Sequence, residues 1–259
     1  MSRMLAALKA LESRRPEAVS PPSDAQALWL DPIIEALPES VEPALKPLAV
    51  HVEPEPVSPS MFEMCSLPAK SDVAEHYLKL SKRIGEQLAS NYCNVLLFVG
   101  VDDGGEPCFS MTELAQAFAL ESDGNVLLVD GDLRCGRLSK SVCPSGTGLI
   151  EAMLGTAHWP EIIHPTTTAR VDFVARGHGH IPTFERPEFG WSALRPKYRA
   201  VLIGIGAADE PETHWLAARC DGVYFVISRP RTKRRAASAA INALRACGAN
   251  VLGCMLTNG

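Results

Sequence analysis

The chain contains no apolar run long enough to cross a membrane. The longest runs, such as that from Val95 to Val101, fall far short of the roughly 20 residues that a membrane-spanning helix needs. The first residues, from Met1 to Lys9, also lack the long apolar stretch and the small-residue cleavage site of a secretory signal. We therefore expect the protein to stay in the cytoplasm.

The sequence also lacks a zinc-binding pattern. It has eight cysteines, but no two of them show the two-residue spacing of a metal knuckle and most lie in apolar surroundings. We interpret them as buried free thiols. His178 and His180 have the spacing of a metal-binding pair, but no third ligand is identifiable, which favours a surface loop over a metal site.

Proline and acidic residues are unevenly distributed. Residues 1–70 hold 11 of the 20 prolines and have 10 acidic against 6 basic residues, so this part carries −4 of the total net charge of −5. We predict a short amphipathic helix over residues 1–15 and a proline-rich, acidic and disordered linker over residues 16–70. An apolar island at residues 27–37 is either a docking motif for a partner or a segment that packs on the chain's own domain.

From residue 71 onward, short apolar runs alternate with helical stretches. This alternation is typical of a parallel sheet covered on both faces. We predict one α/β domain over residues 71–259, a three-layer sandwich with a mostly parallel sheet. The predicted strands are 95–101, 126–130, 171–175, 200–205, 222–228 and 251–257, and the predicted helices are 72–89, 111–121, 149–154, 212–219 and 232–247.

In such a sheet, ligands bind beyond the carboxyl ends of the strands. The loop after the first strand, residues 101–110, has the position of a phosphate-binding loop, which needs converging N–H groups, a lysine and a Ser or Thr. No lysine is present from Asn91 to Gly136, and Pro107 removes an N–H group. Three acidic residues in the loop add negative charge, and at a few Å each repulsion with a phosphate costs on the order of 1–4 kcal/mol.

The segment Val126–Arg134 consists of an apolar run followed by Asp-x-Asp-x-Arg. It resembles the second nucleotide motif of the bacterial tyrosine kinases (BY-kinases) of capsule and exopolysaccharide synthesis, which stand with the MinD/ParA-like ATPases in the deviant Walker A class. The segments Thr147–Gly155 and Arg219–Val226 resemble two further motifs of these kinases. The resemblance spans residues 71–259 and implies a P-loop NTPase-like fold.

The chain departs from these kinases at the other two nucleotide motifs. In one alignment Pro107 and Cys108, and in the other Cys108 and Phe109, stand where the first motif has Lys and Ser or Thr, so both lose the lysine and the hydroxyl. Gly204 stands where the third motif has the Asp that helps to hold the metal. Because two of the three motifs are changed, the resemblance implies a degenerate, inactive kinase-like domain.

The resemblance places the degenerate nucleotide site on two segments. Its residues are Gly104, Gly105, Cys108, Asp130, Asp132 and Arg134, with Asp130 and Asp132 as the Mg²⁺ ligands. We expect no cofactor, and weak binding of Mg-ATP is the alternative. A different interpretation is that Asp130 and Asp132 cap the turn after the strand. Arg134 is then either a phosphate contact or the partner in a surface salt bridge.

Five basic residues gather between Arg229 and Arg235, at the start of the last predicted helix. Positive charge there opposes the helix macrodipole, so an acidic partner explains the run better than helix stability does. The partner-binding residues are Arg231, Lys233, Arg234 and Arg235. Nucleic acid, anionic lipid headgroups and the chain's own acidic linker are candidate partners. An ordinary exposed helix face is the alternative.

The leading hypothesis is a non-catalytic relative of the BY-kinases that acts as a regulatory or binding subunit in exopolysaccharide or capsule synthesis or export. Its partner would be a membrane chain-length regulator or an active BY-kinase, which would bring the cytoplasmic chain to the inner face of the membrane. One alternative is an active tyrosine kinase or ATPase that uses a non-standard loop with Asp130 and Asp132. Another is a partition-type adaptor that binds nucleic acid through the basic run.

Overall fold

The computed structural model describes most of the chain from residue 72 onward. The predicted N-terminal helix, the linker and the apolar island lie outside the described residues. For residues 72–73 and 106–109 the description covers the backbone alone. The described ranges are 72–88, 93–101, 106–121, 124–142, 146–179, 190–229 and 231–257.

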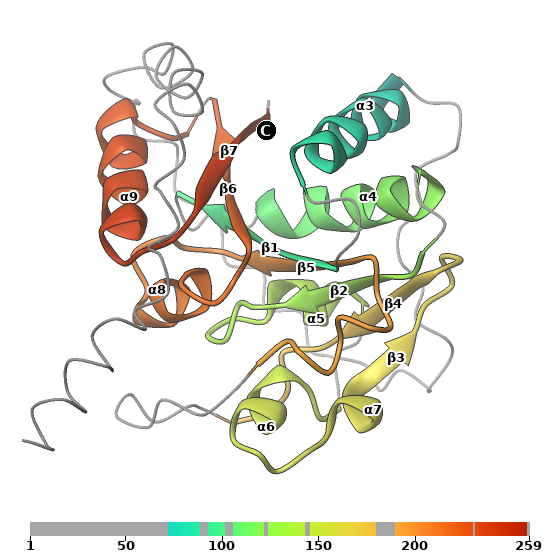
Figure 1. The fold of residues 1–259 in the computed structure, drawn as a ribbon. Coiled ribbons are helices and arrows are strands. Elements are labelled where there is room, and N and C mark those ends of the chain that lie inside the picture. Colours follow the sequence, from blue (N-terminus) through green and yellow to red (C-terminus); the bar gives the residue numbers. More distant parts are fainter. Residues whose placement is uncertain are drawn as a thin grey trace, which may run out of the picture.

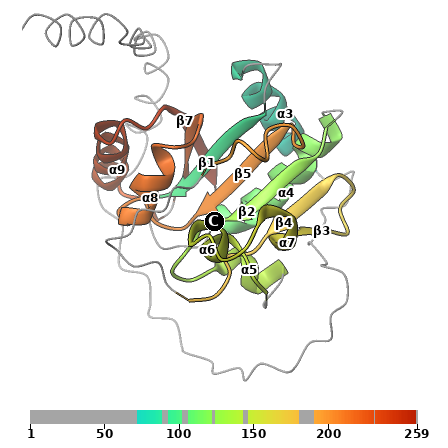
Figure 2. The same cartoon turned by 60° about the horizontal axis from the view of Figure 1, so that its bottom comes forward.

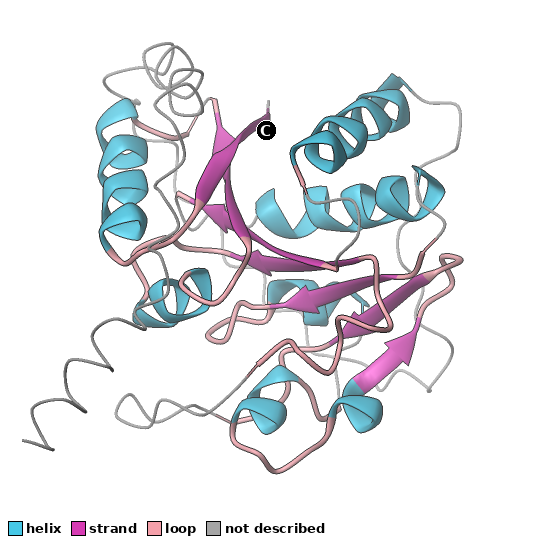
Figure 3. Ribbon diagram, viewed as in Figure 1, coloured by secondary structure: helices cyan, strands magenta, loops and turns pink. Residues whose placement is uncertain are grey.

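A seven-stranded sheet forms the middle of this part of the chain (Figures 1 and 3). The strand order is β3-β4-β2-β5-β1-β6-β7, and every neighbouring pair is parallel except β3 and β4. All six predicted strands form, with bounds that differ by at most one residue. The strands are β1 (Asn94–Gly100), β2 (Val126–Asp130), β3 (Ile163–Pro165), β4 (Val171–Val174), β5 (Ala200–Ile205), β6 (Gly222–Ser228) and β7 (Val251–Thr257).

Helices cover both faces of the sheet, so the predicted three-layer α/β sandwich is confirmed (Figures 1 and 2). One face is covered by α3 (Asp72–Gln87), α4 (Glu106–Glu121) and α5 (Arg137–Val142). The opposite face is covered by α6 (Leu149–Met153), α7 (Trp159–Ile162), α8 (Pro211–Ala217) and α9 (Arg234–Ala246).

The core has two layers of apolar side chains, one on each face of the sheet. Along β1, Leu97 and Val99 point into the layer shared with α8 and α9. Leu96 and Phe98 point into the layer shared with α3 and α4. All four are fully buried. Because both faces of each central strand are covered, the strands read in the sequence as continuous apolar runs rather than as an alternation of apolar and polar residues.

The main departure from the predicted elements lies at the start of α4. The helix begins at Glu106, not at Met111, because Pro107 falls in its first turn, where proline is tolerated and its missing N–H would have no helical partner in any case. The connection from β1 to α4 is therefore only five residues long, from Val101 to Gly105.

Three short elements were not predicted: α5, α7 and β3. With six, four and three residues respectively, they are too short for a sequence periodicity to be recognised. Within the described ranges, no helix combines the length and apolarity that crossing a membrane requires.

Candidate functional site

The carboxyl ends of the parallel strands meet at one edge of the sheet, which is where a ligand of this architecture binds. Strands β2 and β5 are neighbours there, with Asp130 opposite Gly204. The N–H of Gly131 donates to the carbonyl oxygen of Gly204 at 2.9 Å. This pairing brings the acidic turn after β2 next to the loop after β5, which ends at Glu210, the residue before α8.

Asp130 is a fully buried carboxylate that holds the turn and α5 together. Its Oδ1 accepts the Asp132 N–H at 3.1 Å. Its Oδ2 accepts the N–H of Ser139 at 2.7 Å and the Ser139 hydroxyl at 2.6 Å. The Ser139 oxygen in turn accepts the N–H of Arg176 at 2.7 Å. Asp130 thus connects β2 to α5 and, through Ser139, to the loop after β4, which is the geometry of the turn-capping interpretation.

Burial raises the pKa of Asp130 to about 6, against an ordinary value of 3.8, because a charged carboxylate is poorly solvated there. The hydrogen bonds from Ser139 and from the Asp132 N–H act in the opposite direction and stabilise the charged form. Asp130 is therefore a partly protonated structural carboxyl near neutral pH.

Asp132 is also buried, with 2% of its surface exposed. Its Oδ1 accepts the Cys135 N–H at 2.9 Å, whereas its Oδ2 accepts no hydrogen bond. Oδ2 lies 3.6 Å from Nη1 of Arg137. The guanidinium fits there because position 206 is glycine: a Cβ at Gly206 would lie 2.4 Å from the same Nη1. A side chain of the protein therefore supplies the positive charge beside Asp132.

Glu210 forms a second carboxylate–arginine pair at this edge. Its Oε1 accepts a hydrogen bond from Nη1 of Arg134 at 2.9 Å. The Glu210 side chain is 10% exposed and the Arg134 side chain 66% exposed. Burial raises the pKa of Glu210, and the nearby Arg134 opposes that shift. The sequence left Arg134 as either a phosphate contact or a salt-bridge partner. Its geometry here is that of a salt-bridge partner.

Gly204, at which the predicted resemblance would require the Asp of the third motif, lies in β5. The side chain of Met111 from α4 lies over it, so that a Cβ at Gly204 would lie 3.3 Å from the Met111 Cγ. Met111 is fully buried. An apolar side chain therefore fills the space into which a carboxylate at position 204 would project.

These residues fit a Mg²⁺-bound nucleotide poorly. Mg²⁺ takes oxygen ligands in a strict octahedral geometry, but the Asp130 oxygens accept three hydrogen bonds and Asp132 faces Arg137. Among the described residues, no three His, Cys, Asp or Glu side chains gather in a way that could hold a metal. The backbone N–H of His178 donates to Oε1 of Glu151 at 2.9 Å, and His180 lies outside the described residues.

The phosphate-loop residues are only partly described. Gly104 and Gly105 lie outside the described residues, and Cys108 has a described backbone within the first turn of α4. Pro107 and Cys108 thus stand at the start of the helix that follows β1. In a P-loop the Lys and the Ser or Thr occupy that place.

The basic run also lies at the carboxyl edge of the sheet, after β6. Arg231, Lys233 and Arg235 are exposed and Arg234 is half-buried. No acidic residue stands in the first turn of α9 to balance them. Strand β6 is three positions from β2 in the sheet, which corresponds to about 14 Å at the usual strand spacing. The basic run is therefore separate from the acidic turn after β2.

Comparison with solved structures gives consistent matches to two groups of proteins. The kinase domain of the Escherichia coli tyrosine kinase ETK is 19% identical, with a TM-score of 0.62, over 71% of this chain and 74% of that chain. The BceF tyrosine kinase domain is 21% identical, with a TM-score of 0.60, over 71% and 76%. The septum site-determining protein MinD from Pyrococcus horikoshii, complexed with Mg-ADP, is 20% identical, with a TM-score of 0.52, over 63% and 70%.

The chain has the fold of the BY-kinases and of the MinD-type P-loop ATPases. No protein-family model matches it, and no curated protein matches it either. The matches to solved structures confirm the predicted resemblance to the BY-kinases and MinD-type ATPases for the fold.

Sequence reasoning missed the three side chains that close the site: Met111, Arg137 and Glu210. Arg137 follows the second motif by three residues and had no motif to mark it. Glu210 lies six residues after Gly204, too far along the chain to be matched to the third motif. A Glu directly before a helix-starting proline, as in Glu210-Pro211, is the signal that could have identified it.

The raised pKa of Asp130 predicts a specific pH dependence of stability. A carboxyl whose pKa is higher in the folded state stabilises the fold fully below its unfolded pKa, and that contribution is lost as pH rises through about 6. Relative to Asp130→Asn, the wild-type free energy of unfolding should fall by about 2 kcal/mol between pH 4 and pH 7.5, because at pH 4 part of the unfolded chain's Asp130 is already ionised. Urea unfolding at several pH values measures this. Asp209→Asn, at an exposed position, is the control, and a wild type that gains stability against Asp130→Asn would contradict the prediction.

The pair of Asp132 and Arg137 predicts a coupled effect on stability. Arg137→Ala leaves a buried carboxylate without its cation and should lower the free energy of unfolding by about 2 kcal/mol. Adding Asp132→Asn to that variant should recover most of the loss, because the unpaired charge is then gone. The matched control is Arg134→Ala, which removes an exposed arginine and should cost less than about 1 kcal/mol. Additive effects of the two substitutions in chemical denaturation would show that the residues do not interact.

Proposed function

We propose that this chain is a catalytically degenerate BY-kinase-like protein that serves as a regulatory or binding subunit in exopolysaccharide or capsule synthesis or export. The observation that carries the proposal is the closed carboxyl edge of the sheet. There Met111 covers Gly204, and the two carboxylates Asp132 and Glu210 are paired with arginines of the same chain.

The absence of catalysis follows from what phosphoryl transfer needs. Its transition state is stabilised by positioning and by positive charge from a lysine and Mg²⁺, and removal of one such stabiliser typically lowers the rate by about 10² to 10³. Here Pro107 and Cys108 replace the lysine and the metal-binding hydroxyl, and Gly204 replaces the third carboxylate. Together, these replacements lower the expected rate of phosphoryl transfer by several orders of magnitude.

The partner we propose is an active BY-kinase or a membrane chain-length regulator. The likeness of the fold to tyrosine kinase domains supports this choice, because a fold that retains its core without its catalytic groups can still present interaction surfaces. The exposed basic residues Arg231, Lys233 and Arg235 offer a surface for an acidic segment of such a partner. Binding would bring the chain to the inner face of the membrane.

One observation favours a second function. Both carboxylates of the second motif, Asp130 and Asp132, are retained at the carboxyl end of β2. An ATP-dependent kinase or ATPase with a non-standard loop would use them to hold Mg²⁺. Nucleotide binding distinguishes this candidate from the non-catalytic one.

Calorimetric titration with Mg-ATP and Mg-ADP tests the non-catalytic role. We expect no binding in the micromolar range for the wild type. No lysine is present from Asn91 to Gly136 to bind the phosphates, and Arg137 lies beside Asp132. The control is the variant with Asp130→Ala and Asp132→Ala. Micromolar binding by the wild type that this variant loses would overturn the proposal and favour the ATP-dependent candidate.

The regulatory role is tested by adding the chain to an active BY-kinase and following autophosphorylation of that kinase. We expect a changed rate, and we expect Lys233→Glu together with Arg235→Glu to abolish the effect by reversing the charge of the basic run. Arg245→Glu, an equally exposed position in the last turn of α9, is the control and should leave the effect intact. A kinase whose rate and complex formation are unaffected by the chain would contradict the regulatory role.

A further inference from the structure

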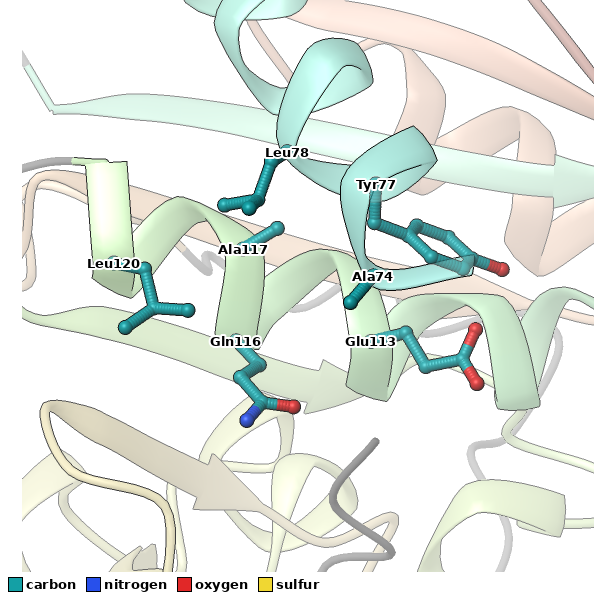
Figure 4. A pocket seen from close by; sticks show the side chains of 7 residues that line it. All are labelled: Ala74, Tyr77, Leu78, Glu113, Gln116, Ala117 and Leu120. Carbon is teal, nitrogen blue, oxygen red and sulfur yellow. The ribbon is translucent and has the colours of Figure 1, made fainter. Parts of the chain in front are cut away.

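A small apolar groove lies between α3 and α4, on the face of the sheet covered by these helices (Figure 4). Its volume is about 40 Å³, which is room for part of one aliphatic side chain. The residues that line it are Ala74, Tyr77 and Leu78 from α3, and Glu113, Gln116, Ala117 and Leu120 from α4.

The groove has an apolar floor and a polar rim. Leu120, at one end, is 62% exposed and is the most exposed large apolar side chain in the described part of the chain. Tyr77, at the other end, hydrogen-bonds with Ser110 and Glu113, and burial raises its pKa to about 12, so its hydroxyl stays protonated at neutral pH. The groove therefore offers an apolar strip, open to solvent at Leu120, that another segment can cover.

We infer that the groove is covered by the chain's own segment Met61–Leu67, which directly precedes α3 and reads Met-Phe-Glu-Met-Cys-Ser-Leu. Only four residues separate Leu67 from Asp72, the first residue of α3. Four residues reach at most about 14 Å, and Ala74 lies about 3 Å along the helix axis from Asp72. The segment is therefore tethered at the near end of the groove.

The segment is long enough to cover the groove, and its side chains suit an apolar cavity. Seven extended residues span about 23 Å, which exceeds the roughly 10 Å of helix between Glu113 and Leu120. Methionine suits a narrow, irregular cavity, because its side chain is unbranched and adaptable. Pro68 follows the segment, and the residue before a proline is held in an extended conformation. This disfavours a simple extension of α3 and favours a chain that turns back over the groove.

The apolar island at residues 27–37 is a less favourable occupant of the groove because its tether is longer. It lies 34 residues before α3, from residue 38 to residue 71. A tether of four residues gives a higher effective concentration, on the order of millimolar for short flexible linkers. The inference modifies our expectation for the linker, whose last residues would be ordered, and it does not depend on the proposed function.

Cys65 within the segment allows a direct test by disulfide trapping in the full-length chain. The partner cysteine is introduced by Gln116→Cys, which leaves Leu120 in place. After oxidation with diamide, peptide mapping by mass spectrometry should show a disulfide between residues 65 and 116 within one chain. The control is Leu154→Cys, a 40% exposed position at the end of α6 on the opposite face of the sheet, which should not pair with Cys65.

A second variant separates packing in the groove from chance collision of a short tether. Met61→Ser together with Met64→Ser in the Gln116→Cys chain should slow formation of the 65–116 disulfide several-fold, whereas Met4→Ser should not. Trapping at residue 116 that is no faster than at residue 154, or that is insensitive to the two methionines, would overturn the inference. A disulfide mainly between two chains would also overturn it and would assign the groove to a second copy.

Discussion

The burial of both faces of the sheet is the constraint on which the rest of this structure depends. Strands β1 and β5 carry no exposed residue, so the backbone hydrogen bonds of the central strands are shielded from water and the strands must be apolar throughout. Polar chemistry is thereby confined to the ends of the strands and to the loops that follow them. Even there, Asp130 and Asp132 are almost completely buried, and each needs compensation from within the chain.

The two carboxylates are compensated in different ways. Asp130 accepts three hydrogen bonds and ties β2 to α5, so its role in holding the fold does not require a ligand. Asp132 accepts one hydrogen bond and faces the guanidinium of Arg137. A buried carboxylate beside a fixed arginine is neutralised in the absence of any bound cation. Both carboxylates of the Asp-x-Asp-x-Arg segment are therefore compensated by groups of the same chain.

Much of the fold could be predicted from the sequence, because the central strands form continuous apolar runs bounded by turn residues. The bounds of β2, β5, β6 and β7 follow directly from those runs. The start of α4 could not be predicted in the same way, since Pro107 reads equally as a loop residue and as a first-turn residue. Short elements such as α5 and β3 contain too few residues to show a period.

The candidate site was predictable in its motifs and not in its contacts. Asp-x-Asp-x-Arg and the substituted position at Gly204 are local features of the sequence. The pairing of Asp132 with Arg137 depends on the fold of the turn, and the cover of Gly204 by Met111 joins positions 93 residues apart in the chain. No local pattern encodes such contacts, so the sequence indicated where the chain departs from the motifs but not which side chains lie at those positions.

The packing of Met111 over Gly204 makes a carboxylate at position 204 unfavourable. An Asp there would bring its Cβ to 3.3 Å from the Met111 Cγ and a charge into an apolar layer. A smaller residue at position 111 alone would leave a void in the same layer. Each substitution by itself is therefore unfavourable. A carboxylate at position 204 and a smaller side chain at position 111 would have to arise together, so the identity of the residue at the end of β5 is tied to that of a residue in α4, 93 positions away in the chain.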